Sequence, residues 1–145
     1  MKMTKKTIEK ICNRIYNELG PYQIESTYGN AMEYELIKEG ITYNRELPIP
    51  ILYDKHKVGH GVVDFFIDGK YLLEFKANTS CFTTKEGKSS NAASVIKSKN
   101  QVIRYLIALN LETGYLINFN IGGKAGLEIE LIINPELGDE WNEMH

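Results

Sequence analysis

The sequence contains little cysteine and no long apolar segment, and each shortage excludes a class of protein. Its two cysteines, Cys12 and Cys81, are too few for a disulfide framework, and their spacing matches no zinc-binding signature. No apolar run is long enough for a transmembrane helix, and the N-terminus lacks the apolar core of a signal peptide. We therefore expect an intracellular, cytoplasmic protein with no membrane partner.

The sequence also lacks an excess of positive charge. It carries 17 lysines and arginines against 19 acidic residues, a net charge of −2, so any contact with phosphates must come from a local patch. Basic residues do gather in two clusters, each of which alone is more simply explained as a solvated surface; contact with nucleic acid requires both to flank one site. The clusters are Lys2, Lys5, Lys6, Lys10 and Arg14, and Lys85, Lys88, Lys97, Lys99 and Arg104.

Length and periodicity predict one domain over residues 1–145, with a core at about 5–133 and a tail at 134–145. The element order α-α-β-β-β-α-β-β predicts an α/β fold, a mixed β-sheet flanked by α-helices. The first strand should lie at an edge or be irregular, because Pro48 and Pro50 cannot donate backbone hydrogen bonds. The expected helices are 4–19, 25–39 and 92–111; the strands are 41–53, 61–67, 71–76, 114–119 and 127–133; 54–60 and 120–126 are turns, and 77–90 is a mobile loop.

Charged residues interrupt two apolar runs on either side of a turn signal. Asp64 lies in the run 61–67, and Glu74 and Lys76 lie in the run 71–76. Charges buried in such strands cost free energy unless a metal or an opposite charge compensates them. Two carboxylates and a lysine on one hairpin could hold a divalent cation beside a phosphate, as a metal-dependent nuclease requires.

The register of this hairpin decides whether the two acids meet. A two-residue turn at Asp68-Gly69 would pair Asp64 with Leu73 and place Glu74 on the other face. A three-residue loop over 68–70, or a bulge near Asp64, would bring Asp64 opposite Glu74. The metal-site hypothesis therefore predicts one of these two irregularities.

The expected cofactor is Mg²⁺ or Mn²⁺, which prefers hard oxygen ligands and takes only one or two protein carboxylates. The candidate ligands are Asp64, Glu74 and the backbone carbonyl of Phe75. Lys76 would orient the attacking water and offset charge on the scissile phosphate; we favour this electrostatic role over that of a base, because a lysine beside carboxylates keeps its proton. A pattern this short also arises by chance, and the alternative is a set of rim charges with Lys76 paired to an acid.

Further motifs make the chain resemble the GxxExxY family, a group within the PD-(D/E)XK nuclease-like superfamily. The resemblance covers roughly residues 5 to 120, with the same order of elements. Its main motifs are Glu25-Ser26-Thr27-Tyr28, Pro48-Ile49-Pro50, Leu73-Glu74-Phe75-Lys76-Ala77, Asn100-Gln101-Val102-Ile103-Arg104-Tyr105-Leu106 and Gly114-Tyr115-Leu116-Ile117-Asn118-Phe119.

The resemblance implies a restriction-endonuclease-like fold and a set of site residues. It points to Glu25 as a further acid, to Gln101 as a polar helper, and to Tyr28 and Tyr105 as residues that line or support the site. Taken without the resemblance, Glu25 is an acid favoured by the helix dipole in a first turn, and Gln101 is an ordinary surface residue. The expected catalytic residues are Glu25, Asp64, Glu74, Lys76 and Gln101; the expected substrate-binding residues are Tyr28, Lys85, Lys88, Lys97, Lys99, Arg104 and Tyr105.

Two features depart from the family pattern. The glycine that names the family is Tyr22 here, although Gly20 lies close by, and this departure concerns the local turn rather than the carboxylates. The stretch between Lys76 and Gln101 is longer than in the family. Long polar loops are often functional, so this one would suit phosphate contact through Lys85 and Lys88.

We expect a metal-dependent nuclease that hydrolyses phosphodiester bonds, most simply in DNA, in repair, recombination or defence. Cutting both strands would favour a homodimer, because one chain supplies one site. The alternatives are a non-catalytic nucleic-acid-binding domain and a protein-interaction domain that retains the fold. Convergence of Glu25, Asp64, Glu74 and Lys76 in one pocket favours the nuclease, and their divergence favours the alternatives.

Overall fold

The computed structural model describes residues 2–84, 86–122 and 126–137. In these ranges, the element order is the one that the sequence predicts. The elements are α1 (Lys5–Leu19), α2 (Glu25–Glu39), β1 (Tyr43–Tyr53), β2 (His56–Ile67), β3 (Tyr71–Lys76), α3 (Ala93–Leu109), β4 (Thr113–Phe119) and β5 (Leu127–Ile133). None of the helices in the described part of the chain combines the length and the apolar character needed to span a membrane.

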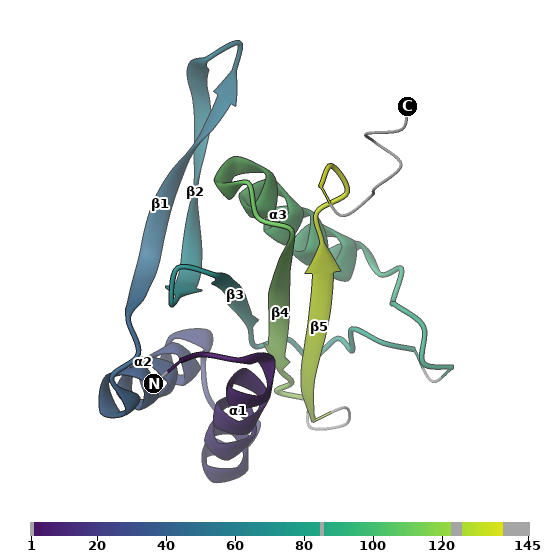
Figure 1. The fold of residues 1–145 in the computed structure, drawn as a ribbon. Coiled ribbons are helices and arrows are strands. Elements are labelled where there is room, and N and C mark those ends of the chain that lie inside the picture. The colour runs from purple at the N-terminus through teal and green to yellow at the C-terminus, as the bar shows by residue number, and fades with distance from the viewer. Residues whose placement is uncertain (1, 85, 123–125, 138–145) are drawn as a thin grey trace.

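The five strands form a single mixed sheet in the order β1-β2-β3-β4-β5. All neighbouring strands are antiparallel except β3 and β4, which are parallel and are connected through α3. Helices α1 and α2 cover one face of the sheet and α3 covers the other (Figure 1). The predicted α/β class, a mixed sheet flanked by helices, is confirmed.

Each face of the sheet has its own hydrophobic core. Ile8 and Cys12 of α1 and Met32 of α2 pack with Phe75 of the sheet, and all four are buried. On the opposite face, a second cluster of buried residues joins α3 to the strands; it includes Val63, Leu72, Val102, Tyr105 and Leu106. Cys12 thus serves as a small apolar side chain of this core.

The loop between β2 and β3 has the longer of the two lengths that the sequence allows. The register pairs Phe65 with Leu73 and Ile67 with Tyr71, which leaves residues 68–70 as a three-residue loop. Asp68 and Gly69 both adopt positive φ angles, of 55° and 64°, a conformation that aspartate tolerates and glycine favours. This loop brings Asp64 to the level of Glu74, as the metal-site hypothesis requires.

Strands β1 and β2 extend past the rest of the sheet as a two-stranded arm (Figure 1). The predicted turn over 54–60 is wrong at its C-terminal side, because β2 already begins at His56. Only Asp54 and Lys55 form the turn, and both have positive φ angles. This two-residue turn lets the following residues pair with β1. The prediction of an edge strand for β1 is confirmed.

The segment between β3 and α3 is a loop, but its middle is anchored to the sheet. Phe82 is fully buried in the core that contains α3. The carboxylate of Glu128 accepts hydrogen bonds from the backbone N–H groups of Phe82 and Thr83, at 2.9 and 3.2 Å. The sequence prediction of a mobile loop misses this anchor, because a single phenylalanine among Ser, Thr, Lys and Gly gives no periodic signal.

Candidate functional site

Asp64 and Glu74 meet where β2 and β3 separate. The ladder between these strands ends at the pair Phe65 and Leu73, one step before the two acids. The side chain of Asp64 takes the place of the next ladder bond, because its Oδ2 accepts a hydrogen bond from the N–H of Phe75 at 2.7 Å. The N–H of Asp64 in turn donates to Oε1 of Glu74 at 3.3 Å. The backbone of each strand end is therefore bonded to the acid of the other strand.

At the level of Asp64, the side chains of β1 and β2 switch from one face of the sheet to the other. Leu47 and Val63 belong to the core on the α3 side, whereas Phe65, two residues after Val63, packs on the side of α1 and α2. Regular alternation would place Val63 and Phe65 on one face, so the pleat is interrupted at Asp64 and at the facing Glu46. Glu46 carries this distortion with a φ of 55°, an uncommon angle for glutamate that marks local strain.

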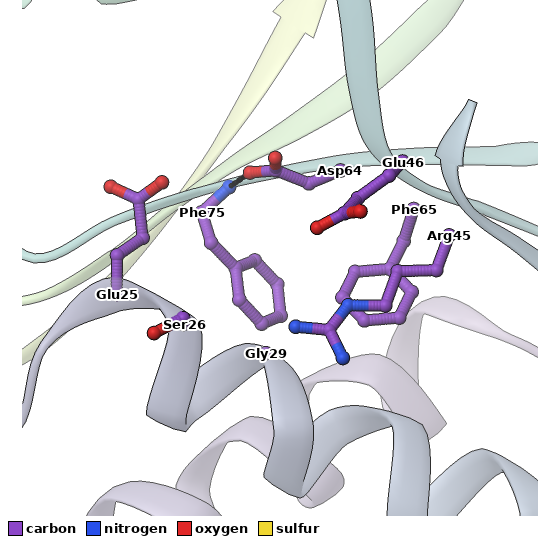
Figure 2. A pocket seen from close by; sticks show the side chains of 8 residues that line it. All are labelled: Glu25, Ser26, Gly29, Arg45, Glu46, Asp64, Phe65 and Phe75. Carbon is purple, nitrogen blue, oxygen red and sulfur yellow. Dashed lines mark hydrogen bonds between the residues drawn. The ribbon is translucent and has the colours of Figure 1, made fainter. Parts of the chain in front are cut away.

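Glu25 approaches Asp64 from the first turn of α2. Figure 2 shows its carboxylate directed towards the hydrogen bond between Asp64 and Phe75. The two acids border one cavity of about 110 Å³, whose opposite side is formed by Arg45 and Glu46. The full lining is Glu25, Ser26, Gly29, Arg45, Glu46, Asp64, Phe65 and Phe75. Glu46 is the acid that sequence reasoning missed, since it lies in a polar stretch of an edge strand.

Glu25, Asp64 and Glu74, which we call the acid cluster, hold their protons more tightly than free carboxyls do. Burial, followed by the charge of Asp64, raises the pKa of Glu74 to about 8. Burial also raises the pKa of Asp64, although the Phe75 N–H and the charge of Lys76 lower it. The pKa of Glu25 is raised by burial and then by the charge of Asp64, with Lys76 opposing. Burial is thus the largest cause of the raised pKa in all three acids.

A chain of hydrogen bonds connects Lys76 of β3, through Gln101, to Tyr105 of α3, and Lys76 lies near enough to the acids to lower the pKa of Asp64 and of Glu74. The ammonium Nζ of Lys76 donates to Oε1 of Gln101 at 2.9 Å, and Nε2 of Gln101 donates to the hydroxyl of Tyr105 at 3.0 Å. Tyr105 is buried, with its ring against Gly61, where a Cβ atom would lie 2.3 Å from Cε1 of the ring. Tyr105 therefore supports Gln101 from within the core, and Gln101 fixes the direction of Lys76.

The residues present fit a divalent cation with hard oxygen ligands. Asp64 and Glu74 are adjacent, partly desolvated carboxylates whose mutual repulsion raises the pKa of Glu74, and a cation between them would relieve that repulsion. Within residues 2–84, 86–122 and 126–137, no group of three His, Cys, Asp or Glu side chains is placed to hold a metal ion. Two carboxylates are enough for Mg²⁺, which takes one or two of them and completes its shell with water and phosphate.

A second cavity, of about 370 Å³, adjoins the acid cluster on the side of α3. It shares Glu25 with the first cavity and also contains Lys76 and Gln101. Lys97 and Arg104 of α3 line it as well, which places two of the predicted basic residues beside the acids. Cationic side chains in this position can receive the phosphates that flank a bond held at the acids.

Other predicted substrate contacts lie elsewhere. Tyr28 is fully buried, so it supports the fold and cannot touch a substrate. Lys99 forms an ion pair with Glu130 of β5 at 2.9 Å and does not line the cavity that Lys97 lines. Lys88 is exposed in the loop before α3, and Lys85 lies outside the described residues. Arg14, from the N-terminal basic cluster, is paired with Glu35 of α2.

The raised pKa of Glu74 predicts that the metal-free protein loses stability as the pH rises. Folded Glu74 keeps its proton up to about pH 8, whereas an unfolded glutamate releases it near pH 4.3. Between about pH 5 and 8 the folded state therefore binds more protons, and the free energy of unfolding falls by a few kcal/mol with rising pH. Glu74→Gln should reduce this slope, as measured by urea denaturation in EDTA.

The matched control for this experiment is Glu18→Gln, an exposed glutamate on α1, which should keep the wild-type slope. Added Mg²⁺ should stabilise the wild-type protein more at pH 8 than at pH 5, because cation and proton compete for the same carboxylates. Parallel pH curves for the wild type and Glu74→Gln would contradict the assigned environment of Glu74.

The chain is similar to a described protein family and to proteins of known structure. A family model described as "PD-(D/E)XK nuclease superfamily" matches residues 2–130. The solved structure titled "Crystal structure of SSO0001" aligns with a TM-score of 0.52 and 19% identity, over 77% of this chain and 50% of that chain. This chain thus spans half the length of that protein, and the likeness shows a shared fold.

A second solved structure, an alkaline exonuclease from Laribacter hongkongensis, aligns with a TM-score of 0.42 and 10% identity, over 99% of this chain and 77% of that one. At this distance the similarity carries no argument about function. A comparison with curated proteins found no match.

Proposed function

The chain belongs to the PD-(D/E)XK nuclease superfamily, and from this membership we propose that it is a nuclease that hydrolyses phosphodiester bonds in DNA with Mg²⁺ or Mn²⁺ as cofactor. Within the superfamily, we assign it to the GxxExxY family on the motifs at Glu25, Glu74 and Gln101. One observation carries the proposal: the side chains of Asp64 and Glu74 are hydrogen-bonded to each other's strand ends, with Lys76 close enough to lower the pKa of both acids and Glu25 close enough to raise that of Glu74.

The acids divide into two groups in this proposal. Asp64 and Glu74, with the backbone carbonyl of Phe75, would hold the cation. Glu25 stands at the N-terminus of α2, between the two cavities, where it can accept a hydrogen bond from the attacking water. When bound, the cation would activate the attacking water and offset negative charge on the phosphate.

Lys76 supplies the positive charge that belongs to the protein itself. Its ammonium group is held by Gln101 at 2.9 Å and borders the cavity that Lys97 and Arg104 line. A fixed cation beside the scissile phosphate stabilises the charge that develops in the transition state, without reorganisation at the moment of reaction. Gln101 is a positioning residue here, since it acts through the lysine.

The basic residues give the substrate a direction of approach. Lys97 and Arg104 line the cavity on the α3 side of the acids. We expect the nucleic-acid strand to lie along this side, with phosphates near these cations. Lys88 in the preceding loop extends the same basic region in sequence. A homodimer would supply the second site needed to cut both strands of a duplex.

A cleavage assay tests the proposal. Wild-type protein is incubated with labelled single-stranded DNA, duplex DNA and RNA in Mg²⁺, in Mn²⁺ and in EDTA. We expect cleavage of at least one DNA substrate with either cation and none in EDTA. Binding to DNA without cleavage under every condition would instead support a non-catalytic domain, and absence of both binding and cleavage would support a protein-interaction domain.

A further inference from the structure

The turn between α1 and α2 exposes two apolar side chains directly before the acid cluster. Tyr22 is 83% exposed and Ile24 is 70% exposed. Ile24 is the N-cap of α2, so the next residue is Glu25, which lines both cavities. Three residues span at most about 11 Å, so the backbone of Tyr22 lies within that distance of Glu25. The exposed apolar surface therefore belongs to the turn that leads directly into Glu25.

This turn is fixed to the core at both ends by one buried side chain. The hydroxyl of Tyr28 donates to the carbonyl of Gly20 at 2.5 Å and accepts from the N–H of Gln23 at 3.3 Å. The ring of Tyr28 stacks on Phe119, with centroids 4.4 Å apart and planes 8° apart. The fully buried Tyr28 thus holds Gly20 and Gln23, between which Tyr22 is presented to solvent.

The ring of Tyr22 is itself placed by Gly20. The backbone of Gly20 has a φ of +68°, and a Cβ atom there would lie 3.0 Å from Cε2 of Tyr22. The missing side chain lets the ring approach the backbone at Gly20, while most of its surface stays open. Stacking a flat ligand on this ring costs little conformational entropy, because a tyrosine side chain has only two rotatable χ angles.

We propose that Tyr22 stacks on an unpaired nucleobase next to the phosphate held at the acid cluster, with Ile24 packing against the same nucleotide. Bases within a duplex are covered on both faces by their neighbours, so the substrate class is single-stranded or locally unpaired DNA. Stacking on tyrosine tolerates every base, because each has a π-face, so this contact selects strand state rather than sequence. The statement about the adjacent phosphate rests on the proposed nuclease function.

The test measures, by fluorescence anisotropy in Ca²⁺ buffer, how tightly the wild-type and variant proteins bind a short fluorescein-labelled single-stranded DNA. Tyr22→Ala should weaken binding roughly 5- to 150-fold, which is the range found when a base-stacking aromatic is truncated. Tyr22→Phe keeps the ring and should bind within about twofold of wild type. The matched control is Tyr34→Ala, a 65% exposed tyrosine on α2, which should not change affinity. The same probe annealed into a duplex should show no dependence on Tyr22.

Equal affinity of wild type and Tyr22→Ala for the single strand, or no binding of the single strand by wild type, would overturn the stacking proposal. Cleavage of the same probes separates this result from the fate of the nuclease function. If Tyr22→Ala cleaves the single-stranded probe at the wild-type rate, the stacking proposal is rejected and the proposed nuclease function is retained. Tyr22-dependent binding without any cleavage supports stacking and rejects the nuclease.

Discussion

Asp64→Asn is expected to lower the rate of phosphodiester hydrolysis at least about a thousandfold, since a bound divalent cation supplies several kcal/mol of transition-state stabilisation. The substitution removes one negative charge and changes the shape of the side chain very little. The amide oxygen can still accept the hydrogen bond from the Phe75 N–H, which Asp64 accepts at 2.7 Å. The separation of β2 and β3 should therefore persist, and the loss is assigned to the charge.

The control for this variant is Asp54→Asn, in the turn of the β1–β2 arm, where the positive φ of 50° is one that asparagine also tolerates. It should cleave at the wild-type rate. Thermal unfolding of both variants should show that each is folded. Wild-type activity in Asp64→Asn would show that Asp64 is not a catalytic residue. The geometry of the hairpin would then have no catalytic role.

Lys76→Met should lower the rate about 100- to 1,000-fold, the cost of removing one preorganised electrostatic group from a catalytic site. Methionine has a similar length and no charge, so it leaves Oε1 of Gln101 without its present donor. Unlike Asp64→Asn, this variant should bind a divalent cation at least as tightly as wild type, because a positive charge near the acids has been removed. Rate and cation affinity thus move in different directions.

Lys10→Met is the matched control, because Lys10 is exposed on α1. It should leave both the rate and the cation affinity unchanged. A loss of cation affinity in Lys76→Met equal to that in Asp64→Asn would mean that Lys76 organises the acids and does not act on the substrate. A rate unchanged from wild type would exclude Lys76 from the mechanism.

The sequence predicts the element order because that order depends on local patterns, but it does not decide whether the acids meet. Helical spacing in α1, α2 and α3 and apolar runs in the strands are short-range signals. The distance between Asp64 and Glu74 follows from the length of one loop, for which residue pairing allows only two registers. Sequence reasoning left both registers open, and the three-residue loop is the outcome that joins the acids.

Prediction from the sequence fails where function and packing depend on contacts between elements that are distant in the chain. Nothing near Tyr28 in the chain indicates that its ring stacks on Phe119 and that its hydroxyl closes the turn before α2. Lys97 and Lys99 are two residues apart on one helix, yet only Lys97 lines the cavity beside the acids. Glu46 faces that site only because the pleat of β1 is interrupted there, at a positive φ that no motif announces.

The central claim is that Asp64 and Glu74 together bind a divalent cation, and titration with Mn²⁺ followed by electron paramagnetic resonance tests it most directly. Free Mn²⁺ gives a signal that disappears on binding, so the measurement does not depend on knowing the substrate. We predict one Mn²⁺ per wild-type chain, binding weakened about a hundredfold or more in Asp64→Asn, and wild-type binding in Asp54→Asn. Equal binding by Asp64→Asn and wild type, or no binding by wild type, would contradict the claim.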